Sequence, residues 1–171
     1  MPGPCPWQPI RARLLPDAER YDGYRSETDM LAAREALERR ARALGLQPLL
    51  WPPDFPFDSD FAMLAATYAQ RIGKGVPFAL AAFRQAFAGG NSLSLADNVL
   101  IAGAACEMHP RAILRAVETR GVREDLEHAT AAARALGVTD VPAVRLGDQV
   151  LIGERSLEQA GGLPAQAGGQ P

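Results

Sequence analysis

The chain has 171 residues, of which 47% are hydrophobic and 22% are charged. This length and balance are typical of one folded, water-soluble domain with or without an insertion, and they exclude a disordered or fibrous protein. The net charge is −2 and no block of lysine and arginine occurs, so neither nucleic acid nor an acidic membrane surface is an expected partner.

Residues 1–6 contain neither a basic start nor an apolar run, so no secretory signal peptide is indicated. The longest apolar stretch, Val99–Cys106, is far shorter than the ~20 residues that cross a bilayer. We therefore expect a cytoplasmic protein without a membrane partner. The two cysteines, Cys5 and Cys106, lack the spacing of a metal site or of a redox dithiol. We expect both thiols to be reduced and separate.

The first predicted elements are a strand and a helix. Residues 5–15 combine prolines with apolar side chains, and because proline fixes the backbone and removes donors, we predict a short edge strand there. Ser26 followed by Asp29 resembles a helix N-terminal cap, the following apolar and charged residues alternate at helical spacing, and Gly45 supplies a stop. This pattern predicts an amphipathic helix of about 18 residues.

A segment rich in proline and aromatic residues comes next, at residues 46–57. It predicts an extended strap that buries aromatic surface. No period-two alternation occurs between residues 26 and 121, so this block is predicted to be an all-helical insertion. Further helices are predicted over Ser59–Ile72, from Pro77 to Gly89, over Ser94–Cys106, from Pro110 to Gly121 and over Val122–Leu136.

The C-terminal part changes character. Val141–Leu146 and Gln149–Ile152 predict two strands joined by Gly147-Asp148, with Gly at the position where a type II′ turn needs positive φ. Ser156 is predicted to cap a short helix that ends at Ala160. Residues 161–171 are rich in Gly, Pro and Gln and are predicted to be a disordered tail.

This order of elements resembles the DsbA-like branch of the thioredoxin superfamily, an α/β fold that carries a large helical insertion. In this interpretation residues 1–25 and 122–160 form the thioredoxin-like part, and residues 26–121 form the insertion. Local motifs are similar to those of the 2-hydroxychromene-2-carboxylate isomerase family, a glutathione-using relative of the kappa-class glutathione transferases. The motifs are Trp7-Gln8-Pro9 with Leu14-Leu15, Leu50-Trp51-Pro52 with Phe55-Pro56, Gly137-Val138, Val141-Pro142-Ala143-Val144 and Gly153-Glu154-Arg155.

The resemblance implies a binding site at Val141 and Pro142. In such folds the Val-Pro bond is cis, and the residue before the proline offers its backbone N–H and C=O to an extended peptide or to the cysteinyl part of glutathione. The alternative for Pro142 is a structural one, a strand-starting proline at a sheet edge.

The resemblance also implies that the stretch after the hairpin holds the γ-glutamyl end of glutathione. Here it reads Gly153-Glu154-Arg155-Ser156. Glu154 or Ser156 would accept from the ammonium group, and Arg155 would bind a carboxylate bidentately. The order departs from the family's Gly-polar-Asp-Arg, and helix capping is the alternative role for Ser156.

The start of the chain departs from the family pattern. The family begins with a strand and a helix that presents a catalytic Ser or Cys, whereas this sequence begins at the match to the second strand. We expect an N-terminal truncation of roughly 30 residues, the usual size of a strand plus a helix, and no catalytic residue in the chain. Cys5 cannot take that role, because Pro4 and Pro6 hold it in an extended segment. Weak or no glutathione binding and marginal stability are the expected consequences.

Other candidate residues have ordinary explanations. Cys106 is expected to be a small buried hydrophobe rather than a reactive thiol. His109 and His128 share no metal-ligand spacing, so we expect both to face solvent and no metal to bind. The aromatic residues line either an apolar substrate cleft or, as we favour, the core; they are Trp51, Phe55, Phe57, Phe61, Phe78, Phe83 and Phe87.

Two functions from different classes remain open. The first is an enzyme, a glutathione-linked isomerase or a thiol-disulfide oxidoreductase in its complete form, acting on a small-molecule or thiol substrate. The second is a non-catalytic peptide- or ligand-binding protein. Glutathione is the only cofactor that the resemblance implies, and the pairing of kappa-class relatives suggests a homodimer.

Overall fold

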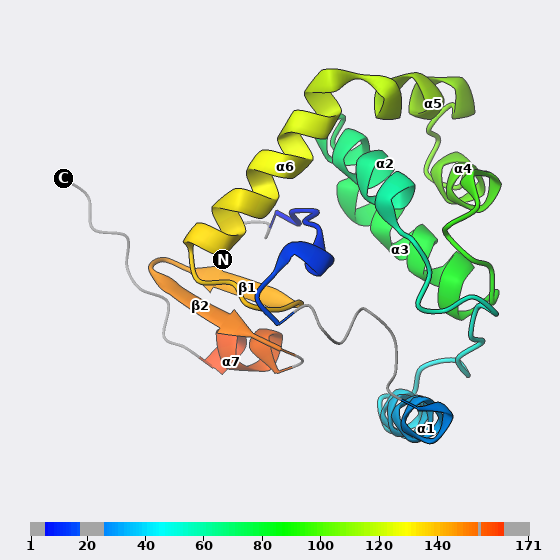
Figure 1. The fold of residues 1–171 in the computed structure, drawn as a ribbon, viewed down its shortest axis with the longest axis vertical. Coiled ribbons are helices and arrows are strands. Elements are labelled where there is room, and N and C mark those ends of the chain that lie inside the picture. Colours follow the sequence, from blue (N-terminus) through cyan, green and yellow to red (C-terminus); the bar gives the residue numbers. More distant parts are fainter. Residues whose placement is uncertain (1–5, 18–25, 154, 163–171) are drawn as a thin grey trace.

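A computed structural model describes residues 6–17, 26–153 and 155–162 (Figure 1). Helices α1 to α6 precede a β-hairpin and a closing helix, and within the described ranges no strand precedes Ala143. The elements are the 3-10 helix η1 (Ala12–Leu14), α1 (Glu27–Ala43), α2 (Asp60–Arg71), α3 (Gly75–Phe87), α4 (Ala96–Ala104), α5 (Pro110–Glu118), α6 (Arg120–Ala135), β1 (Ala143–Leu146), β2 (Gln149–Ile152) and α7 (Ser156–Gly162).

The predicted edge strand at residues 5–15 is wrong. Residues 6–11 form no strand, and the next three form η1. The backbone N–H of Arg11 donates to Thr130 Oγ1 on α6 at 3.0 Å. This part of the chain is therefore held by a helix side chain and not by a neighbouring strand.

The predicted helices are confirmed, with small differences at their ends. Ser26 caps α1 as expected, because its hydroxyl accepts from the backbone N–H of Asp29 at 3.1 Å. Pro77 lies in the first turn of α3, where its missing N–H costs no intrahelical bond. Gly45 follows α1 with φ +68°, the left-handed conformation that ends many helices.

Helices α2 to α6 form the core. The alanine-rich α2 contacts α3, α4, α5 and α6, because its small side chains let neighbouring helices approach closely. The close approach of α4 and α5 also requires Gly103 on α4, because a Cβ at this position would lie 2.3 Å from Cδ1 of Ile113 on α5. The large side chains at the centre are fully buried; they are Phe78, Val99, Ile113, Val122 and Leu126.

The strap packs on the bundle as predicted. The backbone N–H of Leu50 donates to the carbonyl of Phe87 at 2.8 Å, and ring contacts join Trp51, Phe55 and Phe87. The indole Nε1 of Trp51 donates to Glu38 Oε1 on α1 at 3.0 Å. Through these contacts the strap connects α1 to the bundle.

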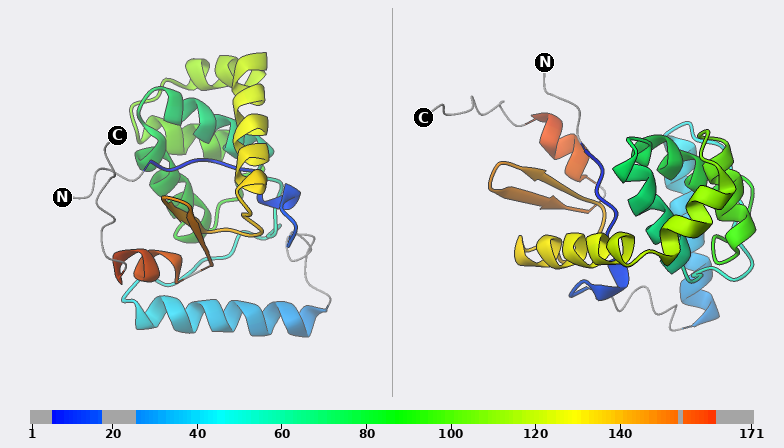
Figure 2. Two further views of the ribbon diagram at one scale, coloured as in Figure 1. Left: turned by 90° about the vertical axis from the view of Figure 1, so that its left-hand side faces the viewer. Right: turned by 90° about the horizontal axis from the view of Figure 1, so that it is seen from above.

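The hairpin and α7 lie at the opposite end of α6 from the bundle (Figure 2). The register pairs Ala143 with Ile152 and Leu146 with Gln149, and Gly147 in the turn has φ +58°. Helix α7 packs on both strands. It ends at Gly162 and not at the expected Ala160; residues 163–171, the predicted tail, lie outside the described residues.

The division into a thioredoxin-like part and a 26–121 insertion stays a prediction. Of the residues that the structure describes, none belongs to a helix long and apolar enough to cross a bilayer.

Candidate functional site

The hairpin brings together two of the segments that the sequence singles out. Because Ala143 pairs with Ile152, the residues before β1 and after β2 meet at the end of the hairpin opposite its turn. The carbonyl of Pro142 accepts from the backbone N–H of Gly153 at 2.8 Å. We call residues 140–142, 153, 155 and 156 the hairpin corner.

Val141 and Pro142 form one side of this corner. The peptide bond between them is cis, Val141 is half-buried and Pro142 is exposed. The backbone N–H of Val141 donates to Oδ1 of Asp140 at 2.7 Å. A ligand that is to accept from this N–H must therefore displace the Asp140 carboxylate.

Asp140 is a residue that the sequence reasoning missed. The available signal was a carboxylate directly before the Val-Pro pair, at a distance along the chain where a side chain can reach the next backbone N–H. Asp140 is half-buried, so its carboxylate belongs to the corner and not to the open surface.

Arg155 and Ser156 form the other side of the corner. Arg155 is exposed and its carbonyl accepts from the N–H of Gln159 at 2.9 Å, which begins α7. The predicted capping role of Ser156 is wrong: Ser156 is the first residue inside α7, is completely buried, and its hydroxyl has no hydrogen-bond partner among the described residues. Glu154, the remaining predicted ligand contact, lies outside the described residues.

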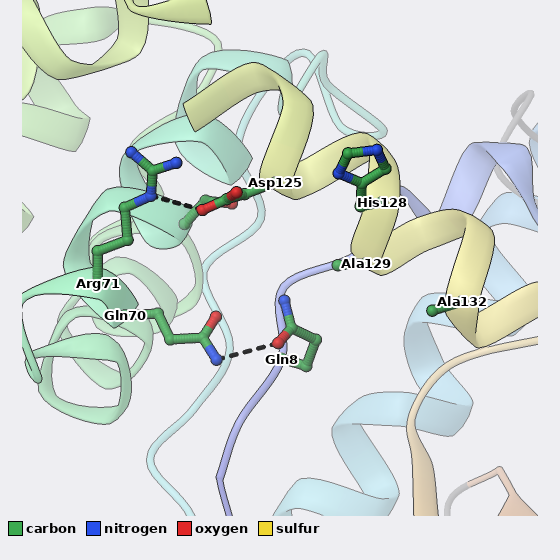
Figure 3. Close-up of a pocket in the computed structure, with 8 residues that line it drawn as sticks. Gln8, Gln70, Arg71, Asp125, His128, Ala129 and Ala132 are labelled. Carbon is green, nitrogen blue, oxygen red and sulfur yellow. Dashed lines mark hydrogen bonds and ion pairs between the residues drawn. The ribbon is translucent and has the colours of Figure 1, made fainter. Parts of the chain in front are cut away.

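A concave feature lies elsewhere, between α2, α6 and the chain near residue 8 (Figure 3). This pocket has a volume of about 500 Å³ and includes none of the predicted binding residues. Its lining consists of Gln8, Thr67, Gln70, Arg71, Asp125, His128, Ala129 and Ala132.

Two polar contacts join the walls of this pocket. Nε2 of Gln70 donates to Oε1 of Gln8 at 3.0 Å, and Nε of Arg71 donates to Oδ2 of Asp125 at 2.5 Å (Figure 3). The bond from Arg71 holds the pKa of Asp125 below its ordinary value, and the same bond raises the pKa of Arg71. These side chains are far apart in the sequence, and no local pattern indicated that they meet.

Neither the hairpin corner nor this pocket contains an activated nucleophile among the described residues. Burial raises the pKa of the Cys106 thiol, so this cysteine forms little thiolate near neutral pH. It packs against the core, as the sequence suggested. Both histidines are exposed, as predicted, and Nδ1 of His109 accepts from the N–H of Arg111 at the start of α5.

No group of three His, Cys, Asp or Glu side chains able to hold a metal ion occurs in the part of the chain that is described. The aromatic residues pack on one another and on the core, and only Phe83 among those seven is largely exposed, at 55%. Core packing accordingly explains most of the aromatic set.

Comparison with known proteins gives a family and a fold. A family model described as a DSBA-like thioredoxin domain matches residues 13–161. A solved structure of 2-hydroxychromene-2-carboxylate isomerase (HCCA isomerase) is similar, with a TM-score of 0.69 and 21% sequence identity, over 81% of this chain and 70% of that chain. At this identity the likeness is one of fold. A comparison with curated proteins gives no match.

Proposed function

Because the chain belongs to the DSBA-like thioredoxin domain family, we propose that it serves thiol chemistry, as a glutathione-linked isomerase or a thiol-disulfide oxidoreductase. The predicted DsbA-like α/β fold is confirmed by the family match and by the structural similarity. The observation that carries the proposal is the hairpin corner, where the register and the bond from Gly153 to Pro142 set the Val141-Pro142 pair against the segment that leads to Arg155.

The corner offers complementary groups to a small thiol peptide. The backbone of Val141 would pair with the cysteinyl amide of glutathione once Asp140 releases its N–H. The exposed guanidinium of Arg155 would bind a carboxylate of the same ligand, and a charged bidentate bond of this kind is stronger than a neutral one. Glutathione is therefore the ligand that we assign to the corner.

A second candidate is a binding protein without catalysis. The observation that favours it is chemical: the described part of the corner contains groups that bind, while its one hydroxyl, on Ser156, is completely buried and accepts or donates no hydrogen bond among the described residues. Nucleophilic catalysis by serine requires an adjacent base. Both candidates place a thiol ligand at the same residues, so the binding test below addresses what they share.

Titration of glutathione into the protein tests the corner. We expect a Kd weaker than about 1 mM, because the ligand must displace the Asp140 carboxylate from the Val141 N–H. Arg155→Gln should weaken binding roughly tenfold, since it removes a charge-assisted hydrogen bond worth about 1.5 kcal/mol. Calorimetry or a ligand-observed NMR titration measures both constants.

The matched control is Arg145→Gln, which removes an exposed arginine from β1, outside the corner. This variant should bind glutathione as the parent protein does. Equal binding by the Arg155 variant and its parent would contradict the assignment of the corner. Retained binding of S-methylglutathione with unchanged affinity would show that the thiol itself is not recognised.

A further inference from the structure

Asp140 lies at one end of the hairpin corner, where its carboxylate influences which peptide can bind. Its Oδ1 accepts from the backbone N–H of Val141 at 2.7 Å, and the residue is half-buried. The carbonyl of the preceding residue, Thr139, accepts from the backbone N–H of Asp17 at 3.1 Å, which fixes the chain directly before Asp140. A ligand that displaces the carboxylate from the Val141 N–H therefore still has this carboxylate beside it.

The direction of a bound peptide follows from the two backbone bonds that Val141 would offer. Two residues exchange both an N–H and a C=O bond when their chains run antiparallel. If the cysteine of the ligand pairs in this way with Val141, the ligand residue before cysteine lies beside Pro142 and the residue after it lies beside Asp140. Pro142 is bonded to Gly153, two residues before Arg155. The γ-glutamyl end of glutathione therefore points toward Arg155, and the glycyl end points toward Asp140.

The two ends of the corner differ in charge. Arg155 is exposed and attracts the carboxylate of the γ-glutamyl residue. At the other end, the glycyl carboxylate of glutathione would lie beside the displaced carboxylate of Asp140, and like charges close together on neighbouring chains are unfavourable. An amide in place of the glycyl carboxylate removes this repulsion and offers an N–H donor to Asp140. A cysteine inside a longer chain presents such an amide.

From this direction and this charge, and resting on the proposed binding of a thiol peptide at the corner, we infer that Asp140 is a specificity-determining residue. It makes the corner prefer a thiol peptide that continues, or is amidated, beyond the residue after cysteine over one that ends there in a free carboxylate. The preferred substrate class is thus a cysteine within a peptide or protein chain, and free glutathione is the weaker ligand. This preference favours the thiol-disulfide oxidoreductase over the glutathione-linked isomerase.

Paired titrations with glutathione and glutathione amide test the inference. The two probes share the γ-glutamyl residue and the thiol, and they differ only at the glycyl carboxyl group. The parent protein should bind the amide roughly threefold more tightly, as measured by ligand-observed NMR, and this difference should decrease as added salt screens the charges. Asp140→Asn keeps an acceptor next to the Val141 N–H without its charge, so this variant should bind both probes equally.

The matched control is Asp148→Asn, which removes an exposed carboxylate from the turn at the opposite end of the hairpin and should keep the preference of the parent. An unchanged amide signal of Gly153, which donates to Pro142, shows that a variant keeps its corner. Equal binding of the two probes by the parent, or tighter binding of glutathione, would overturn the inference and leave the proposed function intact. The same preference in the Asp140 variant would also overturn it. Binding of neither probe would contradict the proposed function, and the inference with it.

Discussion

The carboxylate of Asp54 connects the strap to the bundle by hydrogen bonds. Its Oδ2 accepts from the hydroxyls of Ser92 and Ser94, at 2.6 Å and 2.9 Å. The bond from Ser92 is the main reason that the pKa of Asp54 lies below its ordinary value of 3.8. Ser92 is buried, and the contact joins residues 38 positions apart.

This lowered pKa predicts a pH dependence of stability. A carboxyl group whose pKa is lower in the folded protein stabilises the fold above its ordinary pKa, and this stabilisation is lost as the pH falls through the folded value. Asp54→Asn should lower the free energy of unfolding above pH ~4 and match its parent at lower pH. Urea unfolding at a series of pH values measures this difference. Ser92→Ala removes one of the two hydroxyl donors and should also lower the free energy of unfolding more at neutral pH than at low pH. An equal lowering at every pH would contradict this explanation.

Gly103 allows α4 and α5 to approach each other. A Cβ at this position would lie 2.3 Å from Cδ1 of Ile113, a side chain that is completely buried. We expect Gly103→Ala to lower the free energy of unfolding by about 1–2 kcal/mol, because overpacking costs more than alanine contributes as a helix former. Gly161→Ala, on α7, meets no atom within 4 Å and should be neutral or slightly stabilising. A stabilising effect of both substitutions would show that Ile113 moves aside freely.

At the scale of elements, α1 is held differently from α2 to α6. It has one buried residue, Ala41, and two of its leucines, Leu31 and Leu37, remain about half exposed, as does Leu44 directly after it. Trp51 fixes it through the bond to Glu38, and Arg34 lies over the indole ring at 5.2 Å from its centroid. Trp51 therefore contributes to the attachment of α1, together with the ion pair between Arg40 and Glu158 of α7 at 3.8 Å.

Removal of the indole N–H should loosen α1 selectively. Trp51→Phe keeps an aromatic ring but leaves the Glu38 carboxylate without this donor, so the amides of α1 should exchange several-fold to about tenfold faster. Exchange in α2 to α6 should be unchanged. Trp7→Phe alters a tryptophan that is 44% exposed and serves as the control. Equal acceleration throughout the bundle would contradict a separate attachment of α1.

The elements also show what could be predicted from the sequence. Helices and hairpin follow from local signals, such as Ser26 before α1 and the Gly147-Asp148 turn, because these act within a few residues. The prediction of a strand at residues 5–15 is wrong because a strand requires a partner strand. Arg11 bonds instead to Thr130 on α6. The predicted capping role of Ser156 is wrong for a similar reason. The burial of Ser156 is set by tertiary packing and not by its neighbours in sequence.

At the scale of the whole molecule, the core and the candidate site are separate. The large buried side chains belong to α3, α4, α5 and α6, whereas the hairpin packs mainly on α7. Helix α6 runs from the bundle to the hairpin (Figure 2). The composition of the corner followed from the resemblance, and Asp140 had a local signal in its place directly before the Val-Pro pair. The pocket between α2 and α6 depends on contacts that no sequence pattern encodes.

The most direct test of the account is to map where glutathione binds, through the amide signals of the isotope-labelled protein in an NMR titration. We predict shifts at residues 140, 141 and 153–156 that grow together with ligand concentration, and unchanged signals in α4 and α5. Shifts confined to Gln8, Gln70 and His128 would place the ligand in the pocket between α2 and α6, and would contradict the assignment of the hairpin corner as the thiol-ligand site.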